Sequence, residues 1–175
     1  MALFTNGNSL IQDKQRTRVR EAKCINKFTS QFFSFNCLQQ LFMFCVHFLI
    51  SQMNQVLGFL VTPLKTLSIS YSLISQRDLD SCSCCQILFQ LKHLGLRGVV
   101  LLDFDLMALR CLLMKVVSTL ETLDLQGCRV NDSQVNALLP GFKQCTQISN
   151  VNFYNSDFSM PILKDLSHQQ PTGPR

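Results

Sequence analysis

Apolar residues recur at fixed positions along most of the chain, and this recurrence predicts a series of short strands. In the segment LETLDLQGCRV, residues 120–130, apolar side chains stand at Leu120, Leu123, Leu125 and Val130, and a cysteine stands at Cys128. The alternation around Leu123 and Leu125 is typical of a half-buried strand. The same spacing returns in segments that begin at residues 38, 64, 91, 120 and 148, with steps of 26, 27, 29 and 28 residues. Five matches in register predict a repeat architecture.

The spacing matches the leucine-rich repeat signature, L-x-x-L-x-L-x-x-N/C-x-L, in which each unit makes one strand and one returning segment. Apolar residues follow helical spacing in the return segments 103–117 and 131–140. Asn131 or Asp132 is expected to cap the second helix, and Pro140 is expected to close it. We therefore expect an α/β fold, a leucine-rich repeat solenoid that forms a curved horseshoe segment. Its parallel strands would line the concave face and its helices the convex face.

The register divides the chain into three parts. Residues 1–27 are interpreted as a partial upstream repeat and a basic helical segment, and residues 28–168 as the leucine-rich repeat array, with repeat starts near 38, 64, 91, 120 and 148. Residues 169–175 are polar and contain two prolines, which indicates a disordered tail. No aromatic residue stands among the basic residues between 13 and 27, which favours a solvated helix face over a nucleic-acid site.

Composition fits one intracellular domain that has no membrane span. The chain has 175 residues, of which 47% are hydrophobic, and its 14 phenylalanines with no tryptophan predict that aromatic bulk goes mainly into the core. A net charge of +5 does not by itself indicate a nucleic-acid partner. The apolar run at residues 41–50 is shorter than the roughly 20 residues that cross a bilayer, and is interpreted as a strand that runs into a helix. The start lacks the pattern of a signal peptide, so we expect a cytoplasmic protein, with the nucleus as a second location.

Nine cysteines and three histidines raise the question of metal or redox chemistry. An odd cysteine count without a secretory signal favours reduced, buried thiols over disulfides. The CSCC segment at 82–85 could supply a zinc site, with His93 and Cys111 as the nearest further ligands, but no second paired-cysteine motif follows. No nucleotide-binding, metalloprotease or serine-hydrolase motif is present. We predict a protein that is not an enzyme and needs no metal or cofactor, and the alternative is a metal-dependent enzyme that uses CSCC.

Side chains between the repeat leucines should point outward in three rows across the concave face. The first row is Gln40, Thr66, His93, Thr122 and Asn150; the second is Phe42, Ser68, Gly95, Asp124 and Asn152; the third is Phe44, Ser70, Arg97, Gln126 and Tyr154. Arginine and tyrosine are the residue types that often anchor protein interfaces. The predicted residues of a partner-binding site are His93, Arg97, Asp124, Gln126, Asn152 and Tyr154.

Seven connecting segments resemble the repeats of the PRAME family, which is named for an antigen preferentially expressed in melanoma. They are FTSQF (28–32), CLQQL (37–41), PLKTLSIS (63–70), LKHLGLRGV (91–99), STLETLDLQGC (118–128), DSQVNALLPGFKQC (132–145) and FYNSDFSM (153–160). The resemblance implies a non-enzymatic germline protein that acts as a substrate-recognition subunit of a cullin-RING ubiquitin ligase. It also implies a regulator of transcription, differentiation, proliferation and apoptosis, with cullin-RING ligase components among its partners.

The resemblance also implies that both ends of the chain are truncated. Family members are longer and carry an N-terminal region that docks the ligase adaptor, and no segment of this chain matches that region. The alternative function is therefore a chain that lacks the docking segment and acts as a decoy binder or is inactive.

Overall fold

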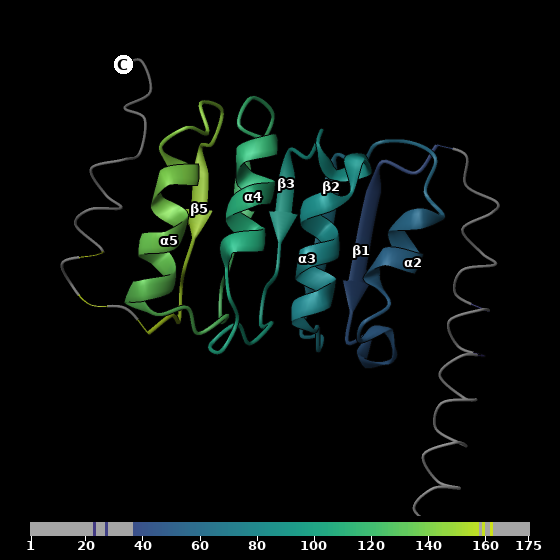
Figure 1. The fold of residues 1–175 in the computed structure, drawn as a ribbon, viewed down its shortest axis with the longest axis horizontal. Coiled ribbons are helices and arrows are strands. Elements are labelled where there is room, and N and C mark those ends of the chain that lie inside the picture. The colour runs from purple at the N-terminus through teal and green to yellow at the C-terminus, as the bar shows by residue number, and fades with distance from the viewer. Residues whose placement is uncertain (1–22, 24–26, 28–36, 158, 160–161, 163–175) are drawn as a thin grey trace, which may run out of the picture.

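Five parallel strands in chain order form a single sheet in this computed structural model, which describes residues 23, 27, 37–157, 159 and 162. The strands are β1 (Gln40–Phe44), β2 (Thr66–Ser70), β3 (His93–Gly95), β4 (Thr122–Asp124) and β5 (Asn150–Asn152). The described helices are α2 (Met53–Gly58), α3 (Gln76–Cys84), α4 (Met107–Lys115) and α5 (Asp132–Phe142), with short 3-10 helices η1 (His47–Leu49) and η2 (Gln86–Leu88). Figure 1 shows the α-helices in a row along one side of the sheet, which gives two layers.

The strand pairing follows the register that the repeat spacing predicts. Thr66 of β2 pairs with Gln40 of β1 and with His93 of β3, and His93 pairs in turn with Thr122 of β4. Thr122 pairs with Asn150 of β5, so each strand lies beside the equivalent strand of the next unit. The register of the predicted rows is therefore confirmed wherever the strands pair, because equivalent positions of neighbouring units stand next to each other. Thr66 of the first row is buried, which differs from the prediction of an outward side chain.

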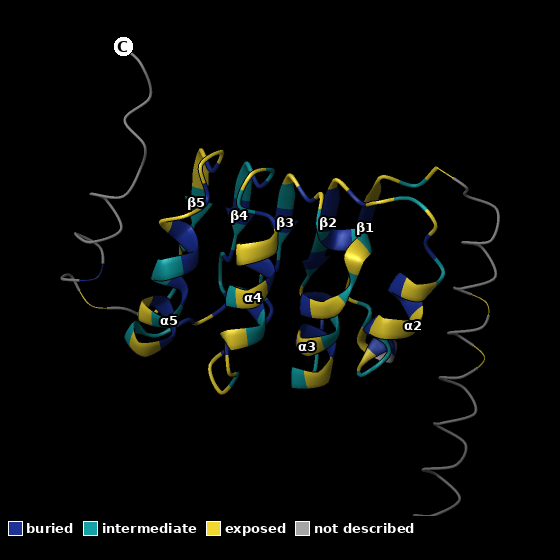
Figure 2. Cartoon of the chain, turned by 45° about the horizontal axis from the view of Figure 1, so that its top comes forward, coloured by how far each residue is buried: buried dark blue, intermediate teal, exposed yellow. Residues whose placement is uncertain are grey.

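The repeated apolar positions form the core between the sheet and the helices. Leu64, Leu91 and Leu120, which occupy the first position of their units, are fully buried, and so is Leu125 of the opening segment. Figure 2 shows the buried residues on the sides of the strands and helices that face each other. The outer units are less covered, since Leu38 and Val151 are only partly buried against this core. Stacking of neighbours therefore supplies the burial that one unit cannot supply alone.

Each strand ends in a turn that requires a left-handed backbone. The residues at this position are Cys45, Tyr71, Gly98, Gly127 and Asn155, with φ values of 53°, 49°, 67°, 70° and 59°. Their amides remain in use: Tyr71 N donates to Arg97 O at 2.8 Å and Gly98 N donates to Gln126 O at 2.7 Å. Glycine and asparagine adopt this conformation readily, whereas tyrosine does so at a cost.

Capping-box residues of α3 and α5 tie their units to the units before them. Asp78 accepts hydrogen bonds from Ser75 N in its own cap and from Ser51 N and Met53 N of the preceding unit, at 2.8, 2.7 and 3.0 Å. Gln134 occupies the same capping-box position in α5 and donates from Nε2 to Leu101 O at 2.6 Å. The Asp78 carboxylate of α3 therefore accepts from backbone N–H groups of the preceding unit, whereas the Gln134 amide of α5 donates to a backbone carbonyl of the preceding unit.

The two predicted return helices exist, but their boundaries differ from the prediction. Asn131, one of the two predicted caps, is the N-cap of α5. Pro140 lies inside the helix and does not close it, which differs from the prediction. The helix continues because Phe142 packs into the core and Lys143 N still donates to Leu139 O at 3.0 Å. The helix expected within 103–117 is the shorter α4, and the carboxylate of Asp105 accepts from Met107 N in its first turn at 2.9 Å.

The described phenylalanines divide between the core and the surface. Phe142 is buried and Phe104 and Phe153 pack partly buried against the core, whereas Phe42 and Phe44 alternate outward on β1 and are exposed. That aromatic bulk goes mainly into the core stays a prediction. The run 41–50 is a strand that continues into a 3-10 helix, as expected.

The predictions for residues 169–175 and for nearly all of residues 1–27 lie outside the described residues. No helix within the described part of the chain is long and apolar enough to cross a membrane.

Candidate functional site

The candidate site is the open sheet face, defined as the sheet face that carries the three outward rows and lies opposite the helices. Its middle and one end are polar and its other end, at β1, is aromatic. Among the predicted site residues, Arg97 and Tyr154 are exposed, and His93, Asp124, Gln126 and Asn152 are half-buried. The structure therefore brings all six predicted residues onto one surface, from three adjacent strands and the turns that follow them.

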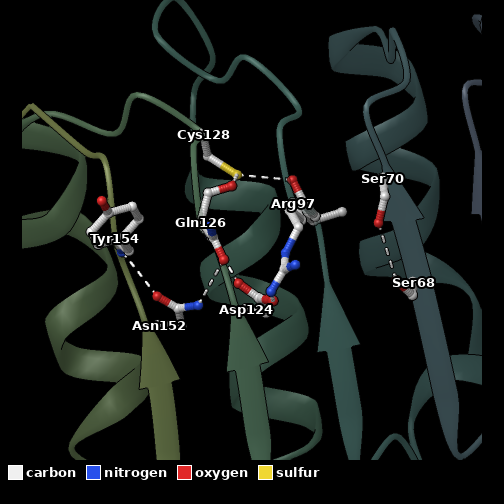
Figure 3. A network of polar contacts seen from close by, with 9 residues as sticks. Ser68, Ser70, Arg97, Asp124, Gln126, Cys128, Asn152 and Tyr154 are labelled. Atoms are coloured by element: carbon white, nitrogen blue, oxygen red, sulfur yellow. Dashed lines mark hydrogen bonds and ion pairs between the residues drawn. The ribbon is translucent and has the colours of Figure 1, made fainter.

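A polar network joins five of these residues across three units (Figure 3). Arg97 Nη2 donates to Asp124 Oδ2 at 3.1 Å, and Asn152 Nδ2 donates to the side-chain oxygen of Gln126 at 3.3 Å. Tyr154 N donates to Asn152 Oδ1 at 2.9 Å, so Tyr154 joins the network through its backbone. Its side chain is 74% exposed, which leaves the ring free of the core. The network fixes the direction of the polar groups before any partner arrives.

Two network residues also have a local structural role. Asp124 Oδ1 accepts from Gln126 N at 3.0 Å, and Asn152 Oδ1 accepts from Tyr154 N two residues later in the same way. Aspartate and asparagine commonly close such turns with their own side chains. Arg97 and the Tyr154 ring have no equivalent task within their own units. They are therefore the clearest choices when binding is to be separated from folding.

The sixth predicted residue, His93, makes its hydrogen bond outside this network. His93 Nδ1 and Thr122 Oγ1 are 2.9 Å apart and share a hydrogen bond. Next to it, Lys92 Nζ lies 2.6 Å from Glu121 Oε1, and this hydrogen bond holds the pKa of the Glu121 carboxyl below its usual value. The pair is exposed, so it contributes little to stability.

Sequence reasoning did not select the aromatic group of the open face. The outward rows include Phe42 and Phe44, but the predicted site residues do not, and Tyr71 belongs to neither set. The rings of Phe44 and Tyr71 meet edge to face, with centroids 5.5 Å apart. The signal that could have found Tyr71 is its place in the repeat, where the next two units have glycine.

The cysteines divide into buried and exposed groups. Burial raises the pKa of the Cys82 and Cys128 thiols to about 12, so both stay protonated at neutral pH. Cys128 Sγ lies 2.9 Å from the carbonyl oxygen of Leu96, to which it donates. Cys84, in the CSCC segment, is exposed. No group of three or more metal-ligating side chains occurs among the residues that the structure describes. That the thiols are reduced and metal-free remains a prediction.

Comparison with known proteins identifies the family of the chain. The family model of the PRAME C-terminal domain matches residues 9–170, which is most of the sequence. The chain belongs to the PRAME family. Two mouse relatives, Preferentially expressed antigen in melanoma-like proteins 1 and 7, are 42% and 41% identical over 159 and 155 residues. These alignments cover 91% and 88% of this chain, but 35% and 32% of the relatives.

A human relative, PRAME family member 12, is 39% identical over 147 residues, which cover 84% of this chain and 30% of the relative. The chain thus spans about a third of the length of these curated relatives. None of the three is named as an enzyme, which fits the prediction of a non-enzymatic PRAME family protein. No solved structure matches the chain.

Proposed function

We propose that this PRAME family chain is a non-enzymatic interaction module that binds a protein partner on its open sheet face. The observation that carries the proposal is the network that joins Arg97, Asp124, Gln126, Asn152 and Tyr154 across three adjacent units. We interpret the sequential parallel sheet with its row of helices as a segment of a leucine-rich repeat solenoid, whose concave side is this face. Such a scaffold presents side chains from several units to one partner at the same time.

The finer role rests on membership of the PRAME family. We propose that the partner is a protein selected for a cullin-RING ubiquitin ligase, and that the chain thereby influences transcription, differentiation, proliferation and apoptosis. The proposed locations are the cytoplasm and the nucleus. Fold and family do not by themselves name a partner, because function resides in the residues that a scaffold presents. The site residues Arg97 and Tyr154 are therefore the starting point for its identification.

The experiment compares the proteins near the wild-type chain with those near the Arg97→Ala, Tyr154→Ala variant, by proximity labelling in germ cells at matched expression. The matched control is Arg77→Ala with Met114→Ala, which removes one arginine and one exposed apolar side chain from α3 and α4. We expect a set of partners that the wild type and the control recover and the site variant loses. Equal recovery by all three proteins would show that the open face does not bind the partner.

Purification of the same proteins tests the ligase role separately. A cullin and its adaptor that co-purify with wild type and with the site variant alike would support a ligase subunit whose substrate face is distinct from its docking surface. Partners recovered without any ligase component would favour the decoy alternative, in which binding is kept and docking is not.

A further inference from the structure

The end of the open sheet face at β1 carries three aromatic side chains that are at least half exposed. Phe42, Phe44 and Tyr71 are 67%, 68% and 50% exposed. Phe42 and Phe44 alternate on the outward side of one strand, and the Tyr71 ring meets Phe44 edge to face. Large exposed apolar side chains that gather in one place commonly mark an interaction site, whereas scattered ones need no explanation.

The backbone of Tyr71 indicates that this ring is placed for a reason other than folding. Tyr71 has φ 49°, in the turn position where the next two units have glycine and β5 is followed by asparagine. A bulky residue in this conformation stores strain, and such strain concentrates at binding sites. The ring also lies over Gly98, since a Cβ atom there would come within 2.5 Å of Tyr71 Cδ1. Strain and close approach both serve to hold an exposed ring beside Phe44.

A cation stands at the inner border of this aromatic group. Phe44 pairs with Ser70, and the repeat register puts Arg97 next in the same outward row. The carbonyl of Arg97 accepts from Tyr71 N. A guanidinium has five N–H donors. Within the described part of the chain, that of Arg97 makes one side-chain hydrogen bond, to Asp124. Its remaining donors are free to bind a carboxylate, which arginine holds in a forked geometry.

We infer that Phe42, Phe44 and Tyr71 anchor one large apolar side chain of an extended segment in the protein partner, and that Arg97 binds a carboxylate of the same segment. Phe44 and Arg97 are two strands apart, about 10 Å at the usual strand spacing. An extended chain covers this distance in about three residues, so the carboxylate lies two or three residues from the apolar side chain. The inference rests on the proposed function, since it places part of the partner on the same face.

The probe is an array of ten-residue peptides in a glycine and serine background. One class carries a leucine and a glutamate two or three positions apart, a second carries leucine and lysine, a third leucine alone and a fourth glutamate alone. We expect the full-length chain to retain the leucine–glutamate class at least tenfold above the others. Phe44→Ser with Tyr71→Asn should abolish this retention, and Arg97→Gln should reduce the leucine–glutamate signal to that of leucine alone. Equal retention of all classes, or unchanged retention by the aromatic variant, would overturn the inference.

Folding is separated from binding by the choice of substitution. Asparagine suits the left-handed turn, as Asn155 does in the unit of β5, so Tyr71→Asn should leave the melting temperature unchanged or raise it while binding is lost. Lys115→Gln, on the helix side, is the control and should retain the peptides as wild type does. A fall in both melting temperature and binding for Tyr71→Asn alone would mean that Tyr71 is structural, and would overturn its role as an anchor.

Other occupants of the aromatic group are distinguished with a photo-cross-linking amino acid at position 42. Adducts with the leucine–glutamate peptide support the inference. Adducts between two copies of the chain, or with residues 1–36 of the same chain, would overturn it in favour of self-association or internal cover. If the aromatic variant keeps its cellular partners while the Arg97→Ala, Tyr154→Ala variant loses them, only this inference fails and the proposed function stands. If neither variant loses partners, the proposed function fails.

Discussion

A Cβ atom on Gly98 would lie 2.5 Å from Cδ1 of Tyr71, so the two positions constrain each other across neighbouring units. Gly98 also has φ +67°, which L side chains rarely adopt. We therefore predict that Gly98→Ala lowers the free energy of unfolding by about 2 kcal/mol or more, because backbone strain and a ring clash add. Urea denaturation followed by circular dichroism measures this change.

Gly127 provides the matched control for this prediction. Its φ of +70° is nearly the same, but the nearest atom to an added Cβ is 3.7 Å away. Gly127→Ala should therefore cost only the backbone part, about 1 kcal/mol. In a protein that already carries Tyr71→Gly, the further change Gly98→Ala should cost about as much free energy of unfolding as Gly127→Ala costs in the wild type. Equal costs for the two single variants would contradict the claimed contact between ring and turn.

Asp78 should be one of the most sensitive polar positions. It is buried and accepts from Ser51 N, Met53 N and Ser75 N, so Asp78→Ala leaves backbone donors of two units without partners. Each buried donor left without an acceptor costs about 1–3 kcal/mol, and we expect a total loss of about 3 kcal/mol or more. Asp80→Ala in the same helix is the control and should cost about 0.5 kcal/mol, since Asp80 is exposed. Chemical denaturation that ranks the two variants equally would rule out this coupling role.

Leu125 tests the stacked core. It is fully buried at the second strand leucine of its unit, so Leu125→Asp places a charge where no water or partner compensates it. We expect a loss of more than 4 kcal/mol, which unfolds most of the array, as shown by loss of the far-ultraviolet circular dichroism signal. Val100→Asp, at an exposed position, should retain that signal. An unchanged melting temperature for Leu125→Asp would refute the repeat register.

The buried thiols predict a loss of stability at alkaline pH. Burial raises the pKa of Cys82 and Cys128 from 9.0 to about 12, so the unfolded state releases its thiol protons first. The stability that the protonated thiols contribute is fully present below pH 9 and is lost as pH rises from 9 toward 12, and at pH 10 the loss should be on the order of 1 kcal/mol per thiol. The drop between pH 8 and pH 10 should shrink in Cys128→Ala under reducing conditions. Cys111→Ala, at an exposed thiol, is the control, and an equal drop in both variants and wild type would contradict the assignment.

Much of the fold is predictable from the sequence because the repeat leucines have one consistent solution. Leu64, Leu91 and Leu120 each open a repeat and are all buried, and the strand register follows from the repeat pattern without any further information. The end of α5 is less predictable, since the effect of Pro140 depends on whether residues after it can pack. Phe142 does pack, which compensates for the missing hydrogen bond.

The open sheet face is predictable in outline and not in detail. Alternation along a strand places Arg97 and Asp124 on one surface, but only the folded structure shows that they form an ion pair. The aromatic group was missed for a similar reason. The outward rows include Phe42 and Phe44, but spacing does not show that Tyr71 lies beside them, because the left-handed turn that holds Tyr71 has no fixed residue type in this chain. Side-chain contacts across units depend on local geometry that spacing alone does not carry.

The central claim is that a protein partner binds the open sheet face, and site-specific photo-cross-linking tests it most directly. A photo-cross-linking amino acid is placed at position 154 on the open face or at position 114 on α4, where Tyr154 and Met114 are both exposed. Each chain is expressed in germ cells, irradiated and purified under denaturing conditions, and the adducts are identified by mass spectrometry. We expect a shared protein adduct from position 154 that is absent from position 114. Adducts from position 114 alone would place the partner on the helices and would contradict binding at the open sheet face.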